Sequence, residues 1–110
     1  MNLVPKSPLN VDQIIKCMQK KWGVAYDMRL VVKGKRLYLH IMWGYLGQQS
    51  FRMDEEAFRN HLAEVIEVIN RLGLSAEVFE WLKNVSQKPR LGKALTFHLN
   101  GDQRIQEFLL

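Results

Sequence analysis

Cysteine is nearly absent from this sequence, because Cys17 is the only one among 110 residues. An intramolecular disulfide is therefore excluded, and so is a zinc site built from several thiolates. Long apolar runs are also missing, since no stretch approaches the ~20 residues that a membrane-spanning helix needs. The N-terminus lacks the hydrophobic stretch of a secretory signal. These absences predict a soluble, cytoplasmic protein that does not associate with a membrane.

The composition is that of a folded globular chain. Hydrophobic residues make up 47% and charged residues 25%, which are close to the averages for globular domains. A chain of 110 residues is long enough to build one hydrophobic core. We therefore expect a single domain over residues 1–110, with residues 1–9 flexible.

Positive charge is concentrated in the first half of the chain. The formal net charge is +5, and residues 1–53 carry nine Lys or Arg against two acids. By contrast, residues 54–80 carry two basic and seven acidic residues. Such an asymmetry attracts an acidic partner or a nucleic acid, although it says nothing about the fold.

Apolar residues recur at helical spacing in three segments. The first helix is predicted over residues 11–21, where Asn10 and Gln13 have the spacing of a capping box. The second runs from an N-cap at Asp54 to a stop at Gly73, and the third covers about residues 76–86. The second helix has the clearest buried stripe, formed by Phe58, Leu62, Val65, Ile69 and Leu72.

Alternating apolar residues predict strands over residues 26–33, 37–43 and 94–99. In the first strand, Asp27 and Arg29 alternate with the apolar residues. A two-residue turn at Gly34-Lys35 would join the first two strands into a hairpin. The order is α-β-β-α-α-β, followed by a short terminal helix near Ile105, Phe108 and Leu109. The fold class is α+β: a small antiparallel sheet, made of the hairpin and a third strand, packed by two to three helices.

Connectivity predicts a candidate binding surface at one end of this sheet. If the second and third helices form an antiparallel pair, residues 22–27, 43–45 and 88–93 converge there. Aromatic side chains beside two cations suit a carboxylate, a phosphate or an acidic loop. The candidate binding residues are Tyr26, Trp43, Tyr45, Arg90 and Lys93. Two simpler interpretations remain open: the aromatic residues could fill the core, and residues 89–93 could form a solvated basic loop.

The stretches KWGVAYD (21–27), IMWGYLGQQSF (41–51) and KPRLGKA (88–94) resemble the signature of a known family. It is the uncharacterised domain-of-unknown-function family 3067 of cyanobacteria and plastids. The resemblance covers residues 15–109 and implies a setting in oxygenic phototrophs. It implies no reaction and no cofactor.

No catalytic centre can be assembled from the sequence. The three histidines, His40, His61 and His98, form no local pair that would bind a metal, and Ser50 lacks a nucleophile-elbow context. We therefore predict no catalytic residues, no metal and no cofactor. The favoured interpretation is a non-catalytic protein-binding or accessory domain whose partner has an acidic surface. The alternative is a nucleic-acid-binding domain that uses the basic N-terminal half: Lys16, Lys20, Lys21, Lys33, Lys35 and Arg36.

Overall fold

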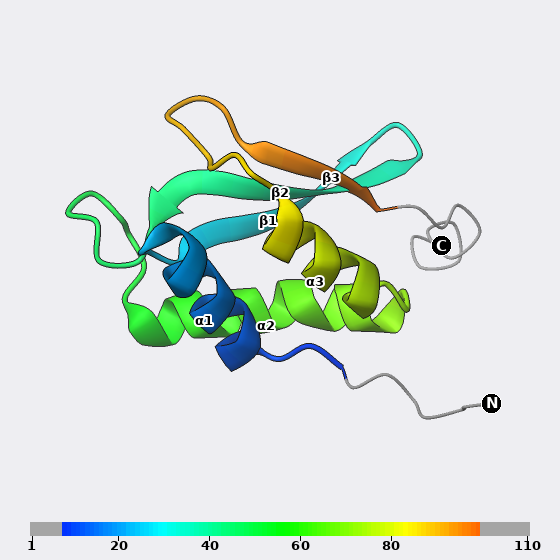
Figure 1. Cartoon of the computed structure of the whole chain (residues 1–110), viewed down its shortest axis with the longest axis horizontal. Helices are drawn as coiled ribbons and strands as arrows, with labels where there is room; N and C mark the ends of the chain where they lie inside the picture. The colour runs from blue at the N-terminus through cyan, green and yellow to red at the C-terminus, as the bar shows by residue number, and fades with distance from the viewer. Residues whose placement is uncertain (1–7, 100–110) are drawn as a thin grey trace.

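Within residues 8–99, three helices and a three-stranded antiparallel sheet follow one another in the predicted order (Figure 1). The structure is a computed structural model and describes residues 8–99. The elements are α1 (Val11–Trp22), β1 (Tyr26–Lys33), β2 (Arg36–Tyr45), α2 (Glu55–Arg71), α3 (Ser75–Asn84) and β3 (Leu95–Leu99). The predicted terminal helix near residues 105–109, and most of the segment predicted to be flexible, lie outside the described residues.

The helix boundaries follow from capping side chains. The Asn10 side chain accepts a hydrogen bond from the Gln13 backbone N–H, and the Gln13 side chain accepts one from the Asn10 backbone N–H, each at 2.9 Å. This is the predicted capping box of α1. At α2, the Asp54 side chain accepts from the Ala57 backbone N–H at 2.9 Å. Both predicted N-caps are therefore confirmed, and α3 ends two residues earlier than expected, where Val85 adopts an extended conformation.

The sheet has the order β1-β2-β3, so β1 and β3 are its edge strands. Lys33 pairs with Arg36 across the predicted turn, and Gly34 has a φ of +61°. This left-handed conformation explains why glycine occupies the first turn position. On the other side of β2, Leu37 pairs with Leu99 and the ladder runs antiparallel to β3.

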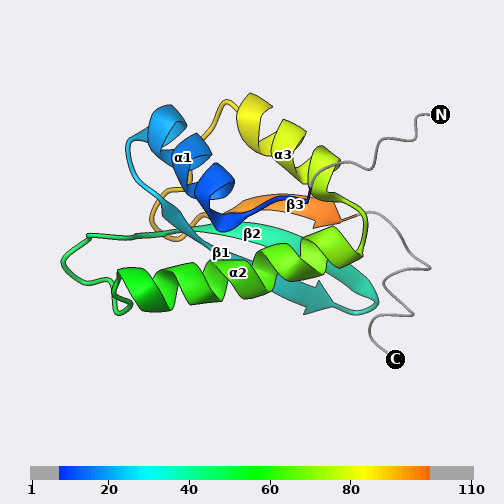
Figure 2. The ribbon, with the colours of Figure 1, turned by 90° about the horizontal axis from the view of Figure 1, so that it is seen from below.

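All three helices cover one face of the sheet, and Figure 2 shows α2 running along β1 with α1 and α3 beside it. The core lies between the helices and the sheet. Leu39 and Ile41 of β2 and Leu62 and Ile69 of α2 are all fully buried there, at 0% exposure. On the edge, Trp81 of α3 packs against the Phe97 ring of β3. The predicted stripe of α2 therefore faces the core.

The start of β1 departs from the predicted alternation. Tyr26, Asp27 and Met28 are all buried, although alternation would expose the middle residue. The pairing explains this, because Tyr26 lies opposite Tyr45 while Met28 lies opposite Ile41. Between these two pairs, β2 has three residues (42–44) where β1 has one, Asp27. Such a β-bulge changes the direction in which the neighbouring side chains point. The alternation predicted for this strand therefore breaks at Asp27.

Within residues 8–99, no helix combines the length and the apolar character that crossing a membrane requires.

Candidate functional site

A cleft of about 820 Å³ opens beside the end of the sheet where β1 begins and β2 ends. Its walls come from these two strands, from the loop after β2, from α2 and from the turn before β3. The lining residues include Asp27, Arg29, Trp43, Arg52, His61 and Leu91. Each of the three stretches that carry the family resemblance therefore contributes a side chain to this cleft.

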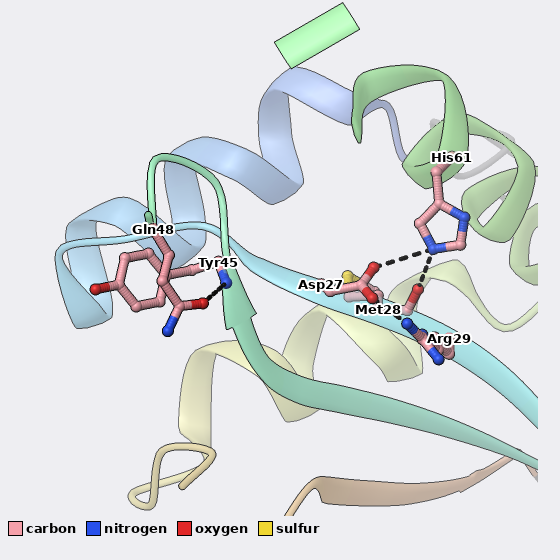
Figure 3. A network of polar contacts seen from close by, with 6 residues as sticks. All are labelled: Asp27, Met28, Arg29, Tyr45, Gln48 and His61. Carbon is pink, nitrogen blue, oxygen red and sulfur yellow. Dashed lines mark hydrogen bonds and ion pairs between the residues drawn. The ribbon is translucent and has the colours of Figure 1, made fainter. Parts of the chain in front are cut away.

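A polar network centred on Asp27 forms one wall of the cleft (Figure 3). Among residues 8–99, Asp27 is the only charged residue that is buried, with 2% exposure. Its Oδ2 accepts a hydrogen bond from Arg29 Nε at 3.0 Å. His61 Nε2 of α2 lies 3.0 Å from Asp27 Oδ1 and 2.7 Å from the Met28 carbonyl oxygen. The network therefore joins the middle of α2 to the edge strand β1.

The Met28 carbonyl identifies the tautomer of His61. A carbonyl oxygen can only accept a hydrogen bond, so Nε2 must carry the proton in this contact. A single N–H cannot point well at both the Met28 carbonyl and Asp27 Oδ1. Asp27 Oδ1 accordingly has no hydrogen-bond partner, although His61 Nε2 lies near it. We interpret the approach of His61 to Oδ1 as an electrostatic contact, and the approach to Met28 as the hydrogen bond. A buried carboxylate held in this way depends on both neighbours.

The loop after β2 is held in place by Gln48 (Figure 3). The side-chain oxygen of Gln48 accepts a hydrogen bond from the Tyr45 backbone N–H at 3.3 Å. The backbone carbonyl of Gln48 accepts one from the Phe51 backbone N–H at 2.9 Å. The Phe51 ring then packs edge-on against Phe58 of α2, with 5.7 Å between ring centroids. These contacts fix the cleft wall that presents Ser50 and Arg52.

The predicted aromatic residues divide between the core and the cleft. Tyr26 is buried and contacts Trp22 and Tyr45 edge-on, at centroid distances of 5.6 and 5.9 Å. Burial, followed by the neighbouring Tyr45, raises the pKa of the Tyr26 hydroxyl. Trp43 instead lines the cleft. Tyr26 and Tyr45 therefore pack against each other, whereas Trp43 borders the cleft.

Residues 90–93 form a tight turn that precedes β3. The Arg90 and Lys93 backbones exchange two hydrogen bonds, of 3.0 and 2.6 Å, and Gly92 has a φ of +77°. Pro89 is buried at the base of the turn, while Leu91 at its tip is 86% exposed. The turn is therefore closed by two backbone hydrogen bonds and presents an apolar side chain to solvent.

The two cations of this turn lie in a hollow of their own. Arg90 and Lys93 line a groove of about 470 Å³ together with Lys88, and none of the three forms an ion pair within residues 8–99. Leu91, between the two cations, lines the larger cleft with Trp43. The structure thus brings Tyr26 next to Tyr45 and links the turn to Trp43 through Leu91. A shared function of the five residues stays a prediction.

The residues of the Asp27 network were not among the predicted site residues. Two signals pointed to it: Asp27 and Arg29 are two residues apart on one strand, and His61 sits at the border of the apolar stripe of α2. Neither signal reveals the bulge that turns Asp27 inward. In the part of the chain that the structure describes, no three His, Cys, Asp or Glu side chains are grouped as a metal site would require.

The chain belongs to the family described as "Domain of unknown function (DUF3067)", which matches residues 12–109. This match confirms the resemblance drawn from the three sequence stretches. Among solved structures, the chain is similar to the solution NMR structure of the Alr2454 protein from Nostoc sp. strain PCC 7120. The two are 29% identical with a TM-score of 0.81, over 93% of this chain and 98% of that chain. No curated protein matches the chain.

Proposed function

We propose that this chain is a non-catalytic binding module, an accessory domain that recognises a partner protein with an acidic surface. The observation that carries the proposal is Leu91, which is 86% exposed between the cations Arg90 and Lys93. An apolar side chain displayed on a turn closed by two backbone hydrogen bonds costs little conformational entropy when a partner covers it. The flanking cations would then favour acidic residues around the contact.

The cleft beside Leu91 supports the same function. Trp43 and Leu91 share its wall, and Trp side chains are frequent anchors of protein interfaces. Arg29 and Arg52 also line this cleft, and both are exposed. A partner side chain entering between Trp43 and Leu91 would therefore meet positive charge on its flanks.

The Asp27 network supports the proposal by holding part of the cleft wall in place. Here His61 Nε2 is directed at the Met28 carbonyl, and Asp27 Oδ2 accepts from Arg29. The His61 contact joins α2 to β1 and the Arg29 contact lies within β1, so we assign the network a role in holding the cleft wall.

The setting that we propose is an oxygenic phototroph. The similar solved structure comes from Nostoc, a cyanobacterium, and the family resemblance carries the same implication, including plastids. The partner would then be a protein of that setting, and binding it would take place in the cytoplasm or its plastid equivalent.

Leu91→Asp is expected to abolish capture of the partner from a native phototroph extract treated with nuclease. The substitution removes the apolar contact and places a carboxylate against the acidic surface, so the captured amount should fall at least about tenfold. Val32→Asp is the matched control, because Val32 is the other large apolar side chain that is strongly exposed within residues 8–99, at 48%. Equal capture by Leu91→Asp and wild type would contradict the proposal, and so would loss of every captured protein on nuclease treatment.

The geometry favours protein over nucleic acid because it divides the basic N-terminal half. Lys20 and Lys21 lie in the last turn of α1, next to the start of β1, while Lys33 and Lys35 lie at the hairpin. The eight residues of β1 separate the two groups, which corresponds to roughly 26 Å along the strand. They therefore do not form one continuous footprint.

Binding to random RNA or DNA is accordingly expected to be weak, independent of base sequence and strongly dependent on salt. Contacts between lysine and phosphate release counterions, so the logarithm of the binding constant should fall linearly with the logarithm of salt concentration. Fluorescence anisotropy with oligonucleotides of several sequences would measure this. A preference for one sequence would show that the chain reads bases and would favour the nucleic-acid alternative.

A further inference from the structure

A separate groove of about 580 Å³ lies between α1 and α3, on residues that the proposed function does not use. Four lysines line it and no acidic residue does: Lys16, Lys20, Lys21 and Lys83. Cys17 and Phe79 form its apolar part, and both are half-buried. The groove thus combines an apolar floor with a positively charged rim.

Part of this positive charge is already neutralised, and part is free. Lys83 Nζ forms an ion pair with Glu80 at 3.1 Å, and Lys21 Nζ donates to the Lys83 carbonyl oxygen at 3.1 Å. Lys16 and Lys20 are exposed and form no ion pair with any residue in 8–99. These two ammonium groups remain available to an external anion.

The floor of the groove is neutral as well as apolar. Burial raises the pKa of the Cys17 thiol, and this effect outweighs the opposing influence of Lys21, Lys83 and Lys20. The thiol therefore stays protonated at neutral pH and behaves as a small apolar group. A ligand of this groove must supply an apolar face together with negative charge at its edges.

We propose that the groove between α1 and α3 is the docking site of an acidic amphipathic helix from a partner protein. Lys16 and Lys20 are four residues apart, so their side chains lie one above the other on the same face of α1. A partner helix laid in the groove would set apolar side chains on Phe79 and Cys17 and its flanking carboxylates on the lysines. This is the usual way in which amphipathic helices occupy hydrophobic grooves.

A nucleic acid suits the same groove less well. Arginine, the residue that binds phosphate in bidentate fashion, is absent from the lining. The balance of apolar floor and lysine rim therefore favours an acidic protein segment.

The lone cysteine allows a direct test, because Cys17 reports on the groove alone. The probe is a synthetic peptide of about 15 residues, near the length at which isolated helices become marginally stable, with leucines along one face and glutamates on both flanks. Bound peptide should shield the thiol, so alkylation by a small maleimide should slow about tenfold at a peptide concentration of ten times Kd. A peptide with glutamine in place of glutamate should protect far less.

Two charge-reversal variants locate the site. Lys16→Glu/Lys20→Glu should weaken peptide binding at least about tenfold, whereas Lys33→Glu/Lys35→Glu changes the net charge equally at the exposed hairpin and should have little effect. If the first variant does not fold by circular dichroism, Lys16→Gln/Lys20→Gln replaces it. Equal weakening by both variants, binding without protection of Cys17, or stronger protection by single-stranded RNA would each overturn the inference. None of these outcomes alters the Leu91 experiment, because Leu91 lies outside this groove.

Discussion

Leu62→Ala and Ile69→Ala are each expected to lower the free energy of unfolding by about 2–5 kcal/mol, the range for large-to-small changes in a packed core. Both side chains are fully buried on α2, at 0% exposure. Each truncation removes apolar contacts within the core and leaves a cavity that the surrounding residues fill only in part. Urea denaturation followed by circular dichroism would measure the change.

Glu64→Ala provides the control for these truncations, since Glu64 lies on the same helix but is exposed. Its effect should stay within about 0.5 kcal/mol, as for most surface substitutions. A loss below about 1 kcal/mol for Leu62→Ala would mean that the α2 stripe contributes little to the core. The assignment of the helical layer would then be wrong.

His61→Ala is expected to lower the free energy of unfolding by about 1–3 kcal/mol, the cost of leaving a buried polar group without its partner. The substitution removes the donor to the Met28 carbonyl and the ring nitrogen that lies 3.0 Å from Asp27 Oδ1. Arg29→Ala should cost less, because the Arg29 side chain is 54% exposed and water can replace its contact with Asp27. Urea denaturation at one pH would compare the two variants.

A double-mutant cycle with Asp27→Asn separates the two contacts of His61. A coupling of about 0.5–3 kcal/mol between His61 and Asp27 is expected for residues in one polar network. His98→Ala is the matched control, since His98 lies exposed on the opposite edge strand, β3. Zero coupling would show that His61 stabilises the fold through Met28 alone.

Much of the fold was predictable because its signals are local. The capping box of Asn10 and Gln13 and the glycine at the hairpin depend on residues within one turn of each other. The apolar spacing of α2 likewise determines which side of that helix is buried. In each case the preference of a short segment agrees with the tertiary structure.

The Asp27 network was not predictable in the same way. Asp27 and His61 are 34 residues apart, and their meeting depends on a bulge that alternation cannot reveal. The pairing of Tyr26 with Tyr45 inserts residues 42–44 opposite Asp27. Strand register of this kind is decided by packing on both strands at once. The available hints were the spacing of Asp27 and Arg29 on one strand and the position of His61 beside the apolar stripe of α2.

For the candidate site, the chain connectivity was predictable but the direction of the side chains was not. Connectivity predicted that three segments, residues 22–27, 43–45 and 88–93, approach one end of the sheet. One residue from each segment lines the same cleft: Asp27, Trp43 and Leu91. The two hydrogen bonds between Arg90 and Lys93 then orient the turn. They direct Leu91 to the cleft and both cations to a different groove, which the spacing of the residues does not disclose.

The most direct test of the proposed binding function compares the affinity of wild type and Arg90→Ala/Lys93→Ala for the captured partner, with the melting temperature of each. We expect a Kd raised at least about tenfold, because two cations facing an acidic surface are lost. The melting temperature should change by less than about 3 °C, since both residues are exposed and such substitutions rarely cost more than about 0.5 kcal/mol. An unchanged Kd would mean that the turn does not bind the partner, and an unfolded double variant would show that the turn is a structural clamp.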